Sequence, residues 1–440
     1  METTRHTQHA TTTMRILYLT PYTPNRIRTR PYHLIGGLTG HGHEVTVLTV
    51  TENAAEEADA RSLDAHCARV ISAPLPRWRA ALNCLLALPS GAPLQSAYSW
   101  QPALMQQLQH LTNGHGEGTP FDVIHVEHLR GARYGLALKS ANAANGRAGA
   151  VGAATPPPIV WDSVDCISHL FSQAATHSRS SFGRIVTRFE LSRTRQYEAK
   201  LPTIFDRTLV TSDADRRALL ALSSGQTPQE TIHVLPNGVD LDYFTPGPAG
   251  EDETQTAAAA AAADGECLVV SGKMSYHANV TMVLRLLRQI MPRVWAHQPH
   301  VRLCIVGKDP TTVIQEFAQH DNVTVTGTVA DIRPYLRRAT IAVAPLTYGA
   351  GIQNKVLEAM ACAAPVVASP QAASALDAQP DRDLMLAGDD DAFAAAILHL
   401  LAHPDRRRQV ATHGRAYVEA HHSWTSITAR LGEIYVDVAH

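Results

Sequence analysis

The chain has 440 residues, a formal net charge of −2 and a sequence pI near 6.9. This charge balance offers no argument for the basic surface typical of nucleic-acid-binding proteins, and we expect no nucleic-acid partner. Apolar residues make up 45% of the chain and charged residues 18%, as in a folded soluble protein with room for two or three domains. The six cysteines are scattered, which predicts neither a disulfide framework nor a zinc site.

The first residues do not resemble a targeting segment. Residues 1–13 are polar and lack the apolar stretch of a secretory signal, so we expect a disordered tail. No run of 18 or more apolar residues predicts a membrane-spanning helix. With the unpaired cysteines, this indicates a cytoplasmic location.

Residues 14–236 predict one α/β domain with a doubly wound parallel sheet. Short apolar runs, each followed by polar or helical sequence, are typical of buried parallel strands. Such runs begin at Met14 and recur at 44–50, 121–127, 159–162 and 207–211. Within this Rossmann-like domain, residues 140–158 have no periodic apolar face, and we expect a disordered surface loop there.

The same pattern of strands and helices repeats after a biased segment. Residues 246–266 are low in complexity and polar, as in a mobile linker or insertion. Strand-like runs resume at Cys267, and residues 267–415 predict a second Rossmann-like domain. Residues 416–440 end the chain with an amphipathic helix over 424–438. Two such domains are expected to face across a ligand cleft at the carboxyl ends of their strands.

The segment 348–369, YGAGIQNKVLEAMACAAPVVAS, combines a glycine loop, an amphipathic helix and a buried strand. Gly349 and Gly351 allow the backbone to approach a ligand closely, and the helix from about Gln353 directs unpaired N–H groups toward it. A diphosphate suits that position. Lys355 could add a positive charge, and Glu358 could accept two ribose hydroxyl bonds. A generic α/β connection has the same order of elements and is the alternative.

This segment resembles the nucleotide-sugar motif of family-4 glycosyltransferases, in which two Glu residues eight positions apart precede Ala-Met-Ala and a Pro-Val-Val strand. The phrases VLPNGVDLDYF at 234–244 and GKMSYHANV at 272–280 further resemble a bacterial branch of that family. The resemblance implies a GT-B fold and a retaining transferase. It also implies a nucleoside diphosphate sugar donor without a separate cofactor, and a helix in 416–440 that crosses back to the first domain.

The acceptor implied by the resemblance is a polysaccharide, lipid-linked or small-molecule acceptor, which suggests polysaccharide biosynthesis. Two alternatives share the fold: a nucleotide-sugar 2-epimerase, and a nucleotide-sugar-binding protein without turnover. The second alternative is prompted by two departures from the family pattern. Ala350 stands where the first Glu would be, and Ala278 stands where a second cation would grip the diphosphate.

Carried over residue by residue, the resemblance predicts the donor site. Its expected members are Gly272, Lys273, Gly349, Ala350, Gly351, Ile352, Gln353, Asn354, Lys355 and Glu358. Lys273 is also a catalytic candidate, because a cation stabilises the charge that develops on the leaving diphosphate. A solvated loop lysine is the other interpretation.

Glu127 and His128 follow a strand of the first domain, at the place where relatives carry a catalytic-site His. We therefore predict that one of them contacts the donor sugar or the acceptor, with a strand-end pair that caps a helix as the alternative. Asp-x-Asp strings such as Asp213/Asp215 fit caps and turns better than a metal site, so no metal is expected.

Two segments could dock on a membrane. Residues 76–89, PRWRAALNCLLALP, place two arginines and a tryptophan ahead of an apolar stretch. The segment 179–195 adds Arg179, Arg184, Arg188, Arg193 and Arg195. A peripheral contact with the inner face of a membrane would suit a lipid-linked acceptor. A buried helix and a solvated charged helix explain these residues as well.

Overall fold

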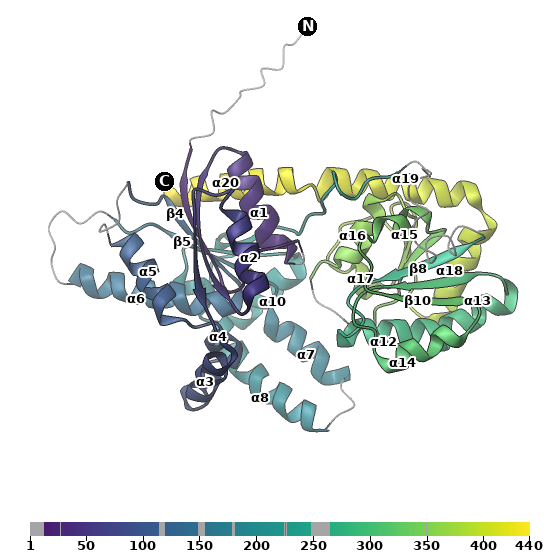
Figure 1. Cartoon of the computed structure of the whole chain (residues 1–440), viewed down its shortest axis with the longest axis horizontal. Helices are drawn as coiled ribbons and strands as arrows, with labels where there is room; N and C mark the ends of the chain where they lie inside the picture. Colours follow the sequence, from purple (N-terminus) through teal and green to yellow (C-terminus); the bar gives the residue numbers. More distant parts are fainter. Residues whose placement is uncertain are drawn as a thin grey trace, which may run out of the picture.

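The structure is a computed structural model, and it describes residues 13–26, 28–113, 119–147, 155–177, 181–223, 225, 227–247, 265–348 and 351–440. Its described part forms two lobes, each built on a parallel sheet covered by helices on both faces (Figure 1). A long helix pair at the end of the chain runs along both lobes (Figure 1). The prediction of an α/β protein with two Rossmann-like domains is confirmed.

The N-terminal lobe contains a seven-stranded parallel sheet with the order β3-β2-β1-β4-β5-β6-β7. Its strands are β1 (Arg15–Thr20), β2 (Glu44–Thr51), β3 (Arg69–Pro74), β4 (Val123–Glu127), β5 (Ile159–Val164), β6 (Arg207–Val210) and β7 (Ile232–Val234). The order reverses between β1 and β4, and the carboxyl ends of the strands on either side of such a reversal form a crevice.

Helices of this lobe connect successive strands. They are α1 (Thr29–Gly40), α2 (Ala54–Leu63), α3 (Arg77–Ala87), η1 (Leu88–Ser90), α4 (Leu94–Tyr98), α5 (Pro102–Thr112), α6 (His128–Arg147), α7 (Ile167–His177), α8 (Ser181–Glu198), α9 (Leu201–Ile204), α10 (Asp213–Leu222) and η2 (Gln229–Thr231). Helix α6 extends into the stretch 140–158, so the disordered loop predicted there is wrong for residues 140–147. Alanine has the highest helix propensity, which favours this continuation.

The C-terminal lobe repeats the design with a six-stranded parallel sheet of order β10-β9-β8-β11-β12-β13. Its strands are β8 (Cys267–Ser271), β9 (Arg302–Val306), β10 (Val323–Gly327), β11 (Ile341–Ala344), β12 (Val366–Ala368) and β13 (Met385–Leu386). Its helices are α12 (His277–Arg285), the π-helix η4 (Leu286–Ile290), α13 (Met291–His297), α14 (Thr312–Gln315), η5 (Glu316–Gln319), α15 (Arg333–Arg338), α16 (Asn354–Ala361), α17 (Pro370–Ala373), α18 (Asp390–Ala402) and α19 (Pro404–His421).

The last helix, α20 (Trp424–Ala439), packs on the N-terminal lobe although α19 packs on the C-terminal lobe. Its buried residues Ile427 and Leu431 join the core that Leu34 and Leu38 of α1 form with the sheet. Helices α1 and α20 are in close contact. A Cβ on Gly37 of α1 would lie only 2.5 Å from the Thr428 side chain of α20. The chain end therefore holds the two lobes together.

Candidate functional site

Two glycines with positive φ follow neighbouring strands at the carboxyl edge of the C-terminal sheet. Gly272, directly after this strand, has φ +145, and a Cβ there would lie 2.8 Å from Asn279 Nδ2. Gly307, after the neighbouring strand β9, has φ +151, and its Cβ would lie 1.7 Å from the Gly272 carbonyl oxygen. Both positions require glycine on conformational and steric grounds. Their close contacts pack the loop after β8 against the loop after β9 and against Asn279 of α12.

Lys355 lies beside this backbone. Helix α16 buries Val356 and Leu357 on its apolar face, and Lys355 points toward β8 instead. Its ammonium donates a hydrogen bond of 2.6 Å to Asn279 Oδ1, and a Cβ on Gly272 would lie 3.6 Å from its Cε. Burial lowers the pKa of Lys355 to about 8, an effect that the nearby Glu358 carboxylate opposes. The ammonium is held in a desolvated position where an anion would be favoured.

Asn279, which the sequence did not single out, orients that lysine. Its side chain donates to the Lys273 carbonyl oxygen at 3.0 Å while its Oδ1 accepts from Lys355. The side chain of Lys273 is exposed, one residue after Gly272. Ala278 is buried in the first turn of α12, so no cation is supplied from that position.

Glu358 follows Lys355 by one helical turn and faces a cavity between the lobes. Burial raises the pKa of Glu358 to about 7, and Lys355 lowers it again in part. The cavity has a volume of ≈ 210 Å³. Its walls come from both lobes and the chain between them, and include Arg26, Thr29, Asp240, Asn354, Glu358 and Trp424. Near neutral pH the carboxylate is an acceptor for hydroxyl groups in this cavity.

Helix α16 begins without a capping side-chain hydrogen bond from its N-cap residue, Gln353, and its first turn carries no acidic residue. Ile352 is buried, and Gly351 has φ +67, a conformation that glycine adopts without strain. Asn354 reaches the other lobe, with its Nδ2 3.5 Å from Thr29 Oγ1. Gly349 and Ala350 lie outside the described residues.

Asp165 closes the cleft opposite this loop. It follows β5, and a Cβ on Gly351 would lie only 2.3 Å from its Oδ1, so a larger residue at position 351 would clash. Thr211 Oγ1 donates to the same oxygen at 3.1 Å. Burial and the charge of Asp215 raise the pKa of Asp165 to about 6. Asp165 thus brings a carboxyl group next to the glycine loop. It does not cap the helix that follows it, because the first backbone N–H groups of α7, those of Ile167 and Ser168, donate to Glu198.

Glu127 ends β4 but is sealed from the cleft. Its side chain has no exposed surface and accepts hydrogen bonds from the hydroxyls of Tyr22, at 2.9 Å, and Tyr18, at 3.5 Å. Burial, with the charge of Asp162 second, raises the pKa of Glu127 to about 8. These contacts are structural, because in this conformation the carboxyl cannot touch a substrate.

His128 occupies the sharp turn between β4 and α6, with φ 63. The residue as a whole is partly exposed, and its ring lies edge-on to Tyr22 with the ring centroids 6.0 Å apart. Burial and the charge of Arg130 lower its pKa to about 3, so the ring is neutral. Nδ1 accepts from the Arg130 backbone N–H at 3.3 Å, which leaves Nε2 as the protonated nitrogen. His128 can therefore donate a hydrogen bond without carrying a charge.

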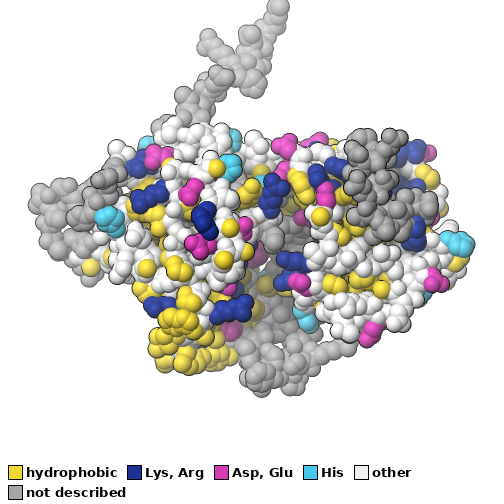
Figure 2. Space-filling view, in the orientation of Figure 1, with side chains coloured by type: hydrophobic (Ala, Val, Ile, Leu, Met, Phe, Trp, Pro, Cys, Tyr) yellow, Lys and Arg dark blue, Asp and Glu magenta, His cyan; other side chains and the backbone are white. Residues whose placement is uncertain are grey.

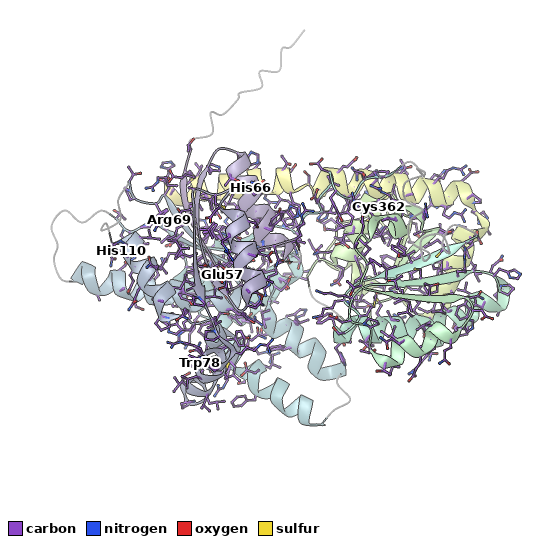
Figure 3. All side chains as sticks on the ribbon, in the orientation of Figure 1. Glu57, His66, Arg69, Trp78, His110 and Cys362 are labelled. Atoms are coloured by element: carbon purple, nitrogen blue, oxygen red, sulfur yellow. The ribbon has the colours of Figure 1, made fainter. Side chains whose placement is uncertain are left out.

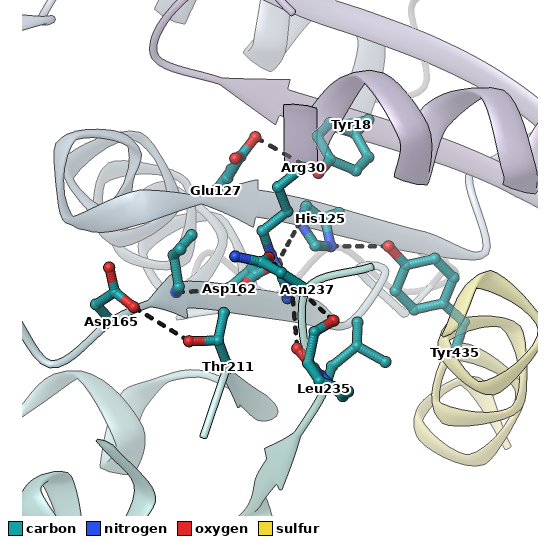
Figure 4. Close-up of polar contacts among 12 residues, drawn as sticks. Tyr18, Arg30, His125, Glu127, Asp162, Asp165, Thr211, Leu235, Asn237 and Tyr435 are labelled. Atoms are coloured by element: carbon teal, nitrogen blue, oxygen red, sulfur yellow. Dashed lines mark hydrogen bonds and ion pairs between the residues drawn. The ribbon is translucent and has the colours of Figure 1, made fainter. Parts of the chain in front are cut away.

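A buried ion pair links this wall to the junction between the lobes (Figure 4). Arg30 Nε donates to Asp162 Oδ2 at 2.8 Å, and its Nη1 donates to the Leu235 carbonyl oxygen and to Asn237 Oδ1. His125 lies 3.8 Å from the same Asp162 oxygen and forms a 2.7 Å hydrogen bond with Tyr435 of α20. Arg26, Arg28 and Arg30 follow β1 in sequence, and of these three Arg26 lines the cavity between the lobes.

No cluster of three or more His, Cys, Asp or Glu side chains suited to a metal ion occurs within the described residues. Asp215 of the Asp213/Asp215 pair instead accepts from the Cys166 backbone N–H and from the Ser212 hydroxyl.

Residues 265–403 match the family described as "Glycosyl transferases group 1". This match covers the lobe that carries Gly272, Lys355 and Glu358.

Two relatives of known activity are similar over part of the chain. The GDP-mannose-dependent monoacylated alpha-(1-6)-phosphatidylinositol monomannoside mannosyltransferase of Corynebacterium glutamicum is 30% identical over 46% of the chain and 56% of its own length. The alpha-maltose-1-phosphate synthase of Mycolicibacterium smegmatis is 27% identical over 50% of the chain and 63% of its own length. The chain thus spans less than two thirds of these relatives.

Solved structures match the whole chain in fold. The Anabaena protein Alr3699/HepE in complex with UDP-glucose has a TM-score of 0.65 at 15% identity, with 96% of this chain and all (100%) of that chain covered. Sucrose-phosphate synthase from Thermosynechococcus elongatus has a TM-score of 0.64 at 19% identity, covering 97% and 99%. The two-lobed architecture is the GT-B fold, as predicted.

Proposed function

We propose that the chain is a glycosyltransferase that moves a sugar from a nucleoside diphosphate sugar to a hydroxyl group of an acceptor. The main supporting observation is that Lys355, in the first turn of α16, lies beside the Gly272 backbone at the carboxyl edge of the C-terminal sheet. The match of residues 265–403 to group 1 glycosyl transferases supports the same conclusion. Glu358 then accepts hydrogen bonds from the ribose.

In the proposed reaction the acceptor oxygen bonds to the anomeric carbon as the bond from that carbon to the phosphate oxygen breaks. The acceptor proton goes to the departing diphosphate. Negative charge develops on that leaving group, and Lys355, Lys273 and the N–H groups of α16 stabilise it. We propose attack from the face that the diphosphate leaves, which retains the anomeric configuration and needs no protein nucleophile.

For the donor and the acceptor we propose a chemical class. One similar protein is named for GDP-mannose and another was solved with UDP-glucose, so guanosine and uridine diphosphate sugars are the first donors to test. A glycan, lipid-linked or small-molecule acceptor fits an open cleft. We further propose a metal-independent reaction in the cytoplasm, within polysaccharide or glycolipid biosynthesis.

The test combines binding and turnover. A panel of nucleotide sugars is screened by thermal shift, since a ligand at a hundredfold excess over its Kd stabilises by about 2.7 kcal/mol. The best donor is then incubated with acceptors, and nucleoside diphosphate release and the anomeric configuration of the product are measured with and without EDTA. Release of nucleoside diphosphate with a retained product and no EDTA effect supports the proposal. Binding without release would indicate a nucleotide-sugar-binding protein instead.

A further inference from the structure

Helix α3 places its large apolar residues toward solvent. Its inward side carries the small or polar residues Ala80, Asn83 and Ala87. Its outward side carries Trp78, Leu82, Leu85 and Leu86, with exposures of 63%, 41%, 62% and 66%. Leu88 and Phe189 extend this surface, which we call the α3 patch. Figure 2 shows the apolar atoms gathered at the lower end of the N-terminal lobe, where Trp78 is labelled in Figure 3.

Polar contacts hold the helix in this orientation. Asn83 Nδ2 donates to the carbonyl oxygens of Tyr98, at 3.2 Å, and Trp100, at 2.8 Å. Arg193 of α8 donates to the carbonyl oxygens of Ala87, Leu88 and Ala92. Turning the leucines inward would break these bonds and bury the guanidinium. The exposure is therefore a fixed property of the lobe.

Arginines surround the α3 patch, whereas the carboxylate next to Phe189, that of Glu190, is buried and accepts a hydrogen bond from the Leu94 backbone N–H. Arg77 and Arg79 flank Trp78, and Arg193 stacks over the Phe189 ring at 4.1 Å. No Asp or Glu occurs between Asp64 and Glu117. An apolar centre with a cationic rim complements a bilayer whose head groups are anionic and whose interior is apolar.

We propose that the α3 patch docks the protein on an anionic lipid membrane as a peripheral contact. A second copy of the chain is a poorer occupant, because a two-fold contact would set the same arginines against each other with no acidic partner on this segment. None of the described helices combines the length and the apolar character that crossing a bilayer requires, so the contact is made by the surface of α3. Trp78 and the leucines enter the head-group boundary while the arginines pair with lipid phosphates.

The position of the α3 patch relates it to the cleft. Strands β3 and β4 run parallel in one sheet, so α3, which follows β3, lies at the same edge as His128, which follows β4. A bilayer held at this edge faces the N-terminal wall of the cleft. If the transfer proposed above is correct, a lipid-linked acceptor reaches the site from that side; docking itself does not depend on the transfer.

The experiment measures co-sedimentation of the full chain with vesicles of phosphatidylcholine alone or mixed with phosphatidylglycerol, without donor or acceptor. We expect binding to the anionic vesicles that high salt weakens. Leu85→Gln/Leu86→Gln should lower the partition constant about tenfold or more, and Arg77→Gln roughly fivefold. The fluorescence of the unchanged protein should shift to the blue on binding, whereas that of Trp78→Phe should not.

The matched control is Ile204→Gln/Val313→Gln, which changes two exposed apolar residues outside the patch, with exposures of 39% and 38%. It should bind like the unchanged protein, and circular dichroism checks that each variant is folded. Absence of binding at every lipid composition overturns the proposal, as does binding that the patch variants leave unchanged. Dimerisation in light scattering that Leu85→Gln/Leu86→Gln abolishes would assign the α3 patch to a second copy instead.

Discussion

Lys355 and Asn279 form a 2.6 Å hydrogen bond that joins the first turn of α16 to the helix after β8. The contact positions a partly desolvated ammonium beside the Gly272 backbone, directly after β8. Because the lysine has few conformations left to lose, an incoming diphosphate meets a preorganised charge.

Lys355→Met should lower kcat by about 100-fold or more, because it removes a cation from the charge that develops on the leaving group. Asn279→Ala should cost about tenfold, since the ammonium remains but loses a hydrogen bond to a charged group. Lys200→Met, at an exposed position of the N-terminal lobe, is the control and should leave kcat unchanged. Initial rates of nucleoside diphosphate release measure all three. Equal kcat for Lys355→Met and the control would remove Lys355 from the site.

Affinity for the nucleoside diphosphate should depend on pH through two groups. As pH rises through about 8, Lys355 loses its proton and its attraction for the diphosphate. As pH falls through about 7, Glu358 gains a proton and loses acceptor capacity for the ribose. Affinity should therefore be greatest between these values, as titration calorimetry across pH can measure. Lys355→Met should abolish the alkaline limb and Glu358→Gln the acid limb. A flat profile in the unchanged protein would contradict both assignments.

Between the two catalytic candidates of the first lobe, the structure favours His128. His128→Asn should lower kcat about tenfold to a hundredfold, because it removes an Nε2–H donor at the cleft. Asparagine tolerates the positive φ at this position, so the turn should survive. Glu127→Gln should leave kcat within about threefold, because the buried glutamate is protonated at neutral pH and an amide preserves its shape. Side-by-side kinetics decide; a larger loss for Glu127→Gln would reverse the assignment.

The architecture could be predicted because buried parallel strands appear in sequence as apolar runs. The run 121–127 became β4 at Val123–Glu127, and the helix expected from about Gln353 begins at Asn354. The unusual backbone at Gly272 and Gly351 could also be predicted, because glycine is required where φ is positive or where another group approaches the main chain closely. The local sequence pattern was therefore enough to predict the fold and the glycine loop of the site.

Contacts between distant segments could not be predicted in the same way. Asn279 orients Lys355 across 76 positions, and Arg30 pairs with Asp162 across 132 positions. For residues 76–89 the sequence left a membrane-docking, a buried and a solvated helix as alternatives, because an amphipathic pattern does not reveal which side of a helix its neighbours cover. Burial of Glu127 also depends on Tyr22 of another loop. Side-chain partners of this kind follow from packing, which the sequence alone does not give.

Two arginines at the start of α1, the N-cap Arg28 and Arg30, should contribute unequally to stability. Arg30→Met should lower the free energy of unfolding by about 3–5 kcal/mol, because it leaves the Asp162 carboxylate buried without its cation. Arg28→Met should cost under about 1 kcal/mol, because the Arg28–Glu56 pair is partly exposed, with side-chain exposures of 33% and 13%. Denaturant unfolding measures both variants. Arg30→Met/Asp162→Asn should recover part of the loss, since no unpaired charge then remains. Equal losses for Arg28→Met and Arg30→Met would show that the buried pair does not support the junction between the lobes.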